Sequence, residues 1–169
     1  MPTIGVALAI PEPWAAQLQD YRTSIGDTTA TQIPTHVTLV PPTDVDEADL
    51  ASIELHLAAA AATVEAFRIR LRGTGTFRPV SPVVFVTLAE GISQCEKLAD
   101  ACRQGPLETE LLYPYHPHVT VAHHLDDATL DRAFDELADF ECLFDADHFS
   151  LYSHHPADGW QPTREFKLA

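Results

Sequence analysis

Apolar and polar residues alternate in two short stretches of the chain, one near residue 36 and one near residue 118. The first reads His36-Val37-Thr38-Leu39 and the second reads His118-Val119-Thr120-Val121. Successive side chains of a β-strand point to opposite faces, so the histidine and threonine of each stretch share one face. The pattern therefore predicts two strands that bury an apolar face in a core and present a polar pair on the other face.

The rest of the chain divides into strands where alternation is strict and helices where apolar residues recur every three or four positions. The expected strands are 4–10, 36–40, 66–77, 82–88, 118–123, 144–154 and 163–168. The expected helices are 13–25, 44–64, 92–102 and 127–140, and Asp44 or Asp46 is expected to cap the second of them. Prolines 34, 41 and 42 should bound the strand at 36–40, because proline cannot donate to a central ladder.

Each half of this series reads strand, helix, His-x-Thr strand, helix, strand, and the two histidines lie 118 − 36 = 82 positions apart in a chain of 169. The order predicts a single α+β domain over 1–169, a bilobal pseudo-twofold duplication with lobes built mainly from about 1–80 and 81–169. Two antiparallel sheets should flank a cleft, with helices on the outer faces. The histidines and threonines would then line the cleft.

Composition narrows the class of protein. The chain is 46% hydrophobic, enough for a substantial core, and carries a net charge of −15, which opposes binding to long nucleic acids or anionic membranes. Its apolar amino terminus has no basic leading segment and suits a first strand better than a signal peptide. The three cysteines form no Cys-x-x-Cys motif, which favours inert buried thiols. We expect a cytoplasmic monomer.

Two histidines on opposing walls suit phosphoryl transfer. Because an imidazole has an ordinary pKa of about 6.5, one ring can accept a proton near neutral pH while the other donates one. In-line displacement at phosphorus needs such groups on opposite sides, one at the attacking oxygen and one at the leaving oxygen. Hydroxyls of Thr38 and Thr120 would bind the nonbridging oxygens. This chemistry needs no metal and no cofactor.

The two His-x-Thr stretches resemble the paired motifs of the 2H phosphoesterase superfamily, which includes 2′-5′ RNA ligase-like proteins and 2′,3′-cyclic nucleotide phosphodiesterases. The hairpin from 71–77 to 82–86 is also similar to the middle section of that family. The resemblance implies a bilobal fold, metal-free hydrolysis of cyclic or 2′-5′ phosphodiesters, and catalytic roles for His36, Thr38, His118 and Thr120. Many relatives carry a basic residue shortly after the second motif, where this chain has Ala122-His123-His124. The expected partner is a small nucleotide or an RNA terminus.

Three further residues are candidates for substrate binding. Arg78 can bind phosphate or belong to a solvated sheet face, and Phe85 and Tyr115 can stack on a base or pack in the core. Two other functions also stay open at this stage. A histidine-rich metal site can be drawn from His116, His118 and the His123-His124 pair, and the chain can be a nucleotide-binding module without catalysis.

Overall fold

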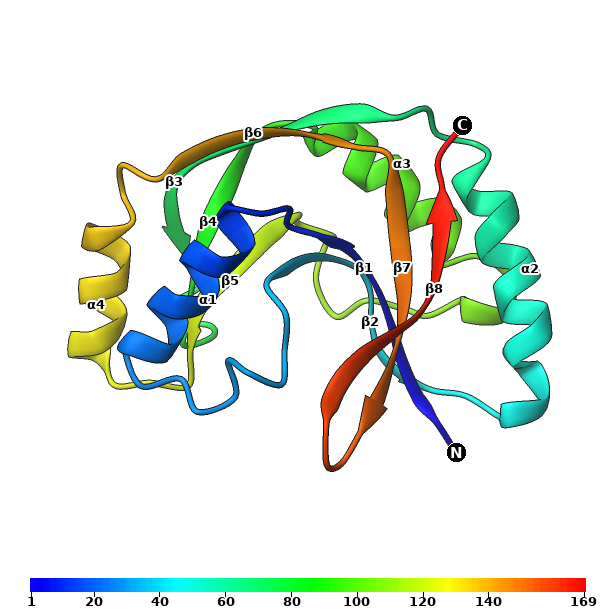
Figure 1. Cartoon of the computed structure of the whole chain (residues 1–169), viewed down its shortest axis with the longest axis horizontal. Helices are drawn as coiled ribbons and strands as arrows, with labels where there is room; N and C mark the ends of the chain where they lie inside the picture. Colours follow the sequence, from blue (N-terminus) through cyan, green and yellow to red (C-terminus); the bar gives the residue numbers. More distant parts are fainter.

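The computed structural model describes all 169 residues and combines eight antiparallel strands with four α-helices (Figure 1). The strands are β1 (Thr3–Ala9), β2 (His36–Asp44), β3 (Phe67–Thr76), β4 (Val83–Glu90), β5 (His118–His123), β6 (Glu141–Ala146), β7 (His148–His155) and β8 (Gly159–Lys167). The helices are α1 (Trp14–Ser24), α2 (Leu50–Ala61), α3 (Ile92–Cys102) and α4 (Asp127–Glu136), with short 3₁₀ turns η1 (Glu47–Asp49) and η2 (Gly105–Leu107). The expected α+β class is confirmed.

All strands belong to one sheet, in the order β6-β3-β4-β5-β2-β1-β7-β8. The structure corrects the expected pair of separate sheets, because β2 and β5 join the two sides through one residue pair in register, Val37 with Val119. The strands that carry the two His-x-Thr stretches are therefore neighbours at the centre of the sheet. The sheet curls, so that the two sides of this junction face different directions (Figure 1).

The two sides of the sheet do not follow the two halves of the chain. Strands β1, β2, β7 and β8 come from the two ends of the sequence and lie on one side of the junction, and β3 to β6 lie on the other. The expected division near residue 80 falls between β3 and β4, which pair with each other. Element order along the chain thus differs from grouping in space.

Two helices cross the junction between β2 and β5. Each of them packs on the side of the sheet that does not contain the strand preceding the helix in the chain. Helix α1 follows β1 but packs against β5, and α3 follows β4 but packs against β2. Helix α2 packs against β8 and α4 against β3, β4 and β5, so each side carries a pair of helices (Figure 1). These crossings tie together two groups of strands that share little backbone pairing.

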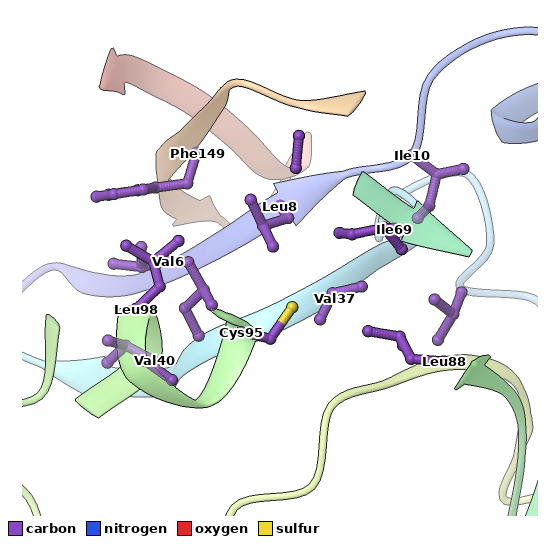
Figure 2. Close-up of a cluster of buried hydrophobic side chains, with 14 of the residues drawn as sticks. Val6, Leu8, Ile10, Val37, Val40, Ile69, Leu88, Cys95, Leu98 and Phe149 are labelled. Carbon is purple, nitrogen blue, oxygen red and sulfur yellow. The ribbon is translucent and has the colours of Figure 1, made fainter. Parts of the chain in front are cut away.

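One continuous core fills the space between the sheet and the helices. Val37 and Val40 of β2 point toward Cys95 and Leu98 of α3, as Figure 2 shows, and all four side chains are buried. His36 and Thr38 alternate with Val37 and so lie on the face away from α3. Burial raises the pKa of the Cys95 thiol to about 12, which agrees with the expected inert cysteine.

Strand β2 is longer than the sequence predicts. It continues through Pro41 and Pro42 to Asp44, and α2 begins only at Leu50 after η1. The prolines are tolerated because neither has a strand partner: β5 pairs with β2 only at Val37, and the β1–β2 register shifts between the pairs of Val40 and Thr43. The expected cap is also wrong, since Asp44 lies in the strand and the Asp46 side chain makes no capping hydrogen bond.

The strand expected at 144–154 is two strands. Strand β6 pairs with β3 on one side of the sheet, and after Asp147 the chain enters β7, which pairs with β1 on the other side. The buried apolar positions shift from even numbers in β6 to odd numbers in β7, for example from Phe144 to Phe149. That change of parity marks the break, and a longer alternating strand would not show it.

None of the helices combines the length and the apolar character that crossing a lipid bilayer requires.

Removing the side chain of Val37 should weaken the junction. The residue is fully buried beneath β2, so we expect Val37→Ala to lower the free energy of unfolding by about 2 kcal/mol through lost burial and a residual cavity. Urea denaturation followed by circular dichroism measures the change. The matched control is Val80→Ala, at a side chain that is 70% exposed, which should stay within about 0.5 kcal/mol of the unmodified chain. Equal losses in the two variants would contradict the packing described here.

Candidate functional site

The pairing of β2 with β5 brings the four motif side chains together. With Val37 opposite Val119 in antiparallel strands, His36 lies opposite Thr120 and Thr38 lies opposite His118. Directly opposed side chains on one face are neighbours, and diagonal ones lie only slightly farther apart. The two histidines therefore occupy the diagonal corners of one quartet, and the two threonines occupy the other corners.

Both imidazole rings are oriented by a backbone carbonyl two residues earlier in the chain. Nδ1 of His36 lies 2.5 Å from the carbonyl oxygen of Pro34, and Nδ1 of His118 lies 2.7 Å from that of His116. A carbonyl only accepts, so each Nδ1 carries the hydrogen and donates it, which leaves Nε2 of the neutral ring as an acceptor. Nε2 of His36 lies 3.1 Å from the Thr38 hydroxyl, which donates to it.

The electrostatic surroundings favour neutral imidazoles. Burial lowers the pKa of His36 below its ordinary value, the Pro34 hydrogen bond opposes this shift, and the charge of Arg22 adds to it. Burial likewise lowers the pKa of His118, where the nearby imidazoles of His116 and His36 add to the effect. Because a proton on one ring disfavours a proton on the other, the pair is suited to hold one proton between them.

A cavity of about 180 Å³ opens beside His36. Its lining comes from β1, β2, β7, β8 and the segment before β2: Gly5, Val6, Ala7, Ile33, Pro34, His36, Thr38, Val40, Pro42, Tyr152 and Trp160. The Trp160 ring packs over Gly5, where an added Cβ would lie 3.4 Å from the ring, in ordinary van der Waals contact. The cavity thus joins two polar groups of the quartet to two aromatic side chains and contains no lysine or arginine.

Aromatic rings occupy the corresponding space beside His118. The His118 ring centroid lies 4.9 Å from that of Phe77 and 5.3 Å from that of Phe85, and His116 lies 6.0 Å away. Gly75 makes room for Phe85, because a Cβ at Gly75 would lie 2.7 Å from its ring. The two histidines are equivalent by motif but not by surroundings.

The structure places the three candidate substrate-binding residues at different distances from the quartet. Phe85 is buried against His118, and Tyr115 packs against the core with its hydroxyl donating to the Thr38 carbonyl oxygen over 2.7 Å. Arg78 lies in a separate pocket, where its guanidinium pairs with Asp131 at 2.9 Å and with Asp127 at 3.7 Å. It would have to leave these carboxylates to meet a phosphate.

Sequence reasoning missed Tyr152, Trp160 and Phe77. Trp160 is the second residue of β8, which begins at Gly159, and nothing near it in the sequence relates it to His36. Its place depends on β1 lying between β2 and β7, which only the sheet order reveals. Alternation along 66–77 predicts the core face for Phe77, whose ring instead lies against His118.

The alternative of a histidine-rich metal site finds no matching geometry. His116 and His118 lie together, as do His123 and His124, with ring centroids 6.0 and 5.1 Å apart. No group of three or more histidine, cysteine, aspartate or glutamate side chains is arranged to hold a metal ion. His123 instead faces Asp27, 3.7 Å from its carboxylate.

Comparison with known proteins identifies a family. The family model of the 2′-5′ RNA ligase superfamily matches residues 10–158. A protein of Halalkalibacterium halodurans named "putative phosphoesterase" is 30% identical over 135 residues, which cover 80% of this chain and 74% of that protein. A Staphylococcus aureus protein of the same name is 22% identical over 173 residues, with 98% and 99% coverage.

Solved structures share the fold at low sequence identity. Escherichia coli LigT complexed with 3′-AMP matches with a TM-score of 0.73 at 19% identity, over 99% of this chain and 98% of LigT. A Thermus thermophilus protein matches with a TM-score of 0.64 at 22% identity, again over 99% and 98%. Usb1 of Kluyveromyces marxianus matches with a TM-score of 0.56 at 14% identity, over 98% of each chain. These likenesses concern the fold.

The buried neutral histidines should make the fold sensitive to acid. Since the pKa values of His36 and His118 are lowered in the folded chain, the unfolded chain binds more protons once the pH falls below about 6.5, and stability falls with it. We expect the drop in unfolding free energy between pH 7.0 and 5.5 to be smaller in the His36→Gln/His118→Gln variant. Urea denaturation at both pH values measures it. An unchanged pH dependence would show that the two rings do not contribute.

Proposed function

Since the chain belongs to the 2′-5′ RNA ligase superfamily, we propose that it is a metal-independent phosphodiesterase acting on 2′,3′-cyclic phosphates or 2′-5′ phosphodiester links of nucleotides and RNA ends. The observation that carries the proposal is the quartet of His36, Thr38, His118 and Thr120 on one face of two paired strands. The match to the family model and the relatives named as phosphoesterases support the reaction class.

The proposed reaction adds water across one phosphorus–oxygen bond. One imidazole takes a proton from the attacking water as its oxygen bonds to phosphorus. The bond from phosphorus to the leaving ribose oxygen breaks, and that oxygen receives a proton from the other imidazole. The shared Nδ1 hydrogen-bond pattern supports these roles, because it leaves Nε2 of both rings to exchange protons, and Nε2 of His36 contacts the Thr38 hydroxyl of the quartet. Exchange with solvent then returns each ring to its starting protonation state.

The threonines are proposed to bind the nonbridging oxygens of the phosphate. The Thr38 hydroxyl donates to His36 Nε2 without ligand, and it is free to rotate toward a phosphate oxygen once that nitrogen is protonated or engaged. Thr120 occupies the matching corner beside His118. Two neutral donors suit a singly charged diester better than a doubly charged monoester, because the cavity lining contributes no cation to offset a second buried charge.

The cavity beside His36 is the proposed nucleoside site. Its apolar lining and the Tyr152 and Trp160 rings suit a base, and E. coli LigT has been crystallised with the nucleotide 3′-AMP. The net charge of −15 favours a small nucleotide or an RNA terminus over a long RNA body. We assign no binding role to a metal or a cofactor.

The difference between the two sides suggests which histidine is the acid. The leaving oxygen belongs to the ribose, so a nucleoside beside His36 brings that oxygen to His36. In-line attack then requires water on the His118 side, where the Phe77 and Phe85 rings pack against the imidazole. His36 is therefore the proposed general acid and His118 the proposed general base.

Replacing either histidine should abolish most of the activity. We expect His36→Ala and His118→Ala each to lower kcat by about 10²- to 10⁴-fold, or roughly 3 to 5 kcal/mol of barrier, because each removes one proton transfer. The assay uses chelator-treated protein and a panel of 2′,3′-cyclic nucleotides and short 2′-5′-linked oligonucleotides, with the position of the product phosphate recorded. His155→Ala, at the exposed end of β7, is the matched control.

A variant with near-normal kcat would remove that histidine from the mechanism. Binding of nucleotides without turnover by the unmodified chain would replace the enzyme with a non-catalytic binding module.

The acid and base assignments can be separated by the leaving group. With a methyl aryl phosphodiester, 4-nitrophenolate departs without protonation, whereas phenolate needs an acid. The loss of rate in His36→Ala should therefore shrink about tenfold when 4-nitrophenyl replaces phenyl, and the loss in His118→Ala should stay constant. Steady-state kinetics with both esters measures the ratios. The opposite pattern would exchange the two roles.

A further inference from the structure

A buried ion pair lies beneath the loop that leads into β2. The Arg22 and Asp27 side chains are each 4% exposed, and the Arg22 Nε lies 3.2 Å from the Asp27 carboxylate. Thr29 completes the coordination of Asp27 by donating to its other oxygen from its backbone amide and its hydroxyl. Burial raises the pKa of Asp27, but the hydrogen bonds from Thr29 and Arg22 outweigh that effect and lower it overall. Asp27 is thus a carboxylate at neutral pH.

Arg22 also donates to Gln19 Oε1 over 3.3 Å, and its other hydrogen bonds contact the residues on either side of Pro34. Its Nη1 donates to the carbonyl oxygen of Ile33 over 2.6 Å and lies 3.3 Å from the Thr35 hydroxyl. Between these two contacts lies the carbonyl of Pro34, the group that accepts the His36 Nδ1 hydrogen. One guanidinium therefore holds the Ile33 carbonyl and the Thr35 hydroxyl, on either side of the group that orients the imidazole.

The same ion pair reaches the second motif strand. Nε2 of His123, at the end of β5, lies 3.7 Å from the Asp27 carboxylate on the side that Arg22 contacts. Asp27 thus stands between the approach to β2 and the end of β5, two strands that share only the Val37–Val119 pair. A buried ion pair is a weak source of stability, because the cost of desolvating two charges offsets their attraction. Positioning explains its arrangement better than stability does.

We propose that Arg22 is a positioning residue for His36, which fixes the Pro34 carbonyl and so keeps the imidazole in the Nδ1–H tautomer with Nε2 facing the quartet. The inference rests on the proposed function for its effect on catalysis, but its effect on the tautomer does not. Arg22 is buried and is not itself one of the residues that line the cavity; its one bond to the lining is to the backbone carbonyl of Ile33. Its loss should therefore affect turnover more than nucleotide binding.

The test compares Arg22→Lys with Arg164→Lys. Lysine keeps the charge but cannot span Asp27, Ile33 and Thr35 at once. Arg164 of β8 makes one exposed ion pair, with Glu54 of α2, and serves as the matched control. Two-bond ¹H–¹⁵N correlation of the imidazoles at pH 7.5 reports the His36 tautomer, and kinetics with a 2′,3′-cyclic nucleotide report kcat and KM.

We expect Arg22→Lys to raise the Nε2–H fraction of His36 several-fold and to lower kcat about 10- to 100-fold, with KM within about twofold. Thr35→Val, which removes one Arg22 contact and keeps the side-chain shape, should shift the tautomer in the same direction by less. This second variant decides the matter if Arg22→Lys does not fold.

A His36 tautomer in Arg22→Lys or Thr35→Val equal to that in Arg164→Lys would overturn the proposal, whatever the change in stability. A tautomer shift together with an unmodified chain that turns over no phosphodiester would support the positioning role and reject the proposed function.

Discussion

The candidate site depends on one backbone pairing, that of β2 with β5 at Val37 and Val119. This single register decides that the two polar pairs lie on the same face and that the histidines are diagonal to each other. A slip by one residue would turn one polar pair into the core and one valine into the site. The buried valines oppose such a slip, because exposing either would lose apolar burial and would bury a histidine among aliphatic side chains.

So short a ladder needs support from outside the two strands. Helices α1 and α3 each cross from one side of the junction to the other, and the Tyr115 hydroxyl ties the segment before β5 to the Thr38 carbonyl. The Arg22–Asp27 pair adds a contact below the sheet. Between the two strands the scarcity of backbone hydrogen bonds is compensated by packing and by a few side-chain bonds, which act on the residues beside the motifs.

Much of this could be predicted from the sequence because it depends on local periodicity. Alternation placed His36 with Thr38 on one face, and the helix at 92–102 and the strand at 118–123 are confirmed at both ends. The sequence does not reveal which distant segments pair. The union of the sheets through Val37 and the approach of Trp160 to Gly5 depend on sheet order, which no local pattern encodes. The division of the chain into halves near residue 80 likewise depends on strand pairing, since β3 and β4 on either side of it pair with each other.

The two motifs are alike in sequence, so any difference between their histidines must come from the neighbouring strands. Beside β2 the residues paired with His36 and Thr38 are Ala9 and Ala7, which leave a cavity. Beside β5 the residue paired with Thr120 is Phe85, whose ring packs against His118. In the proposed reaction, this difference gives a direction to a pair of groups that are alike in sequence, because the nucleoside is assigned to the cavity side. Under that proposal the small residues of β1 set the direction of attack without a role in proton transfer.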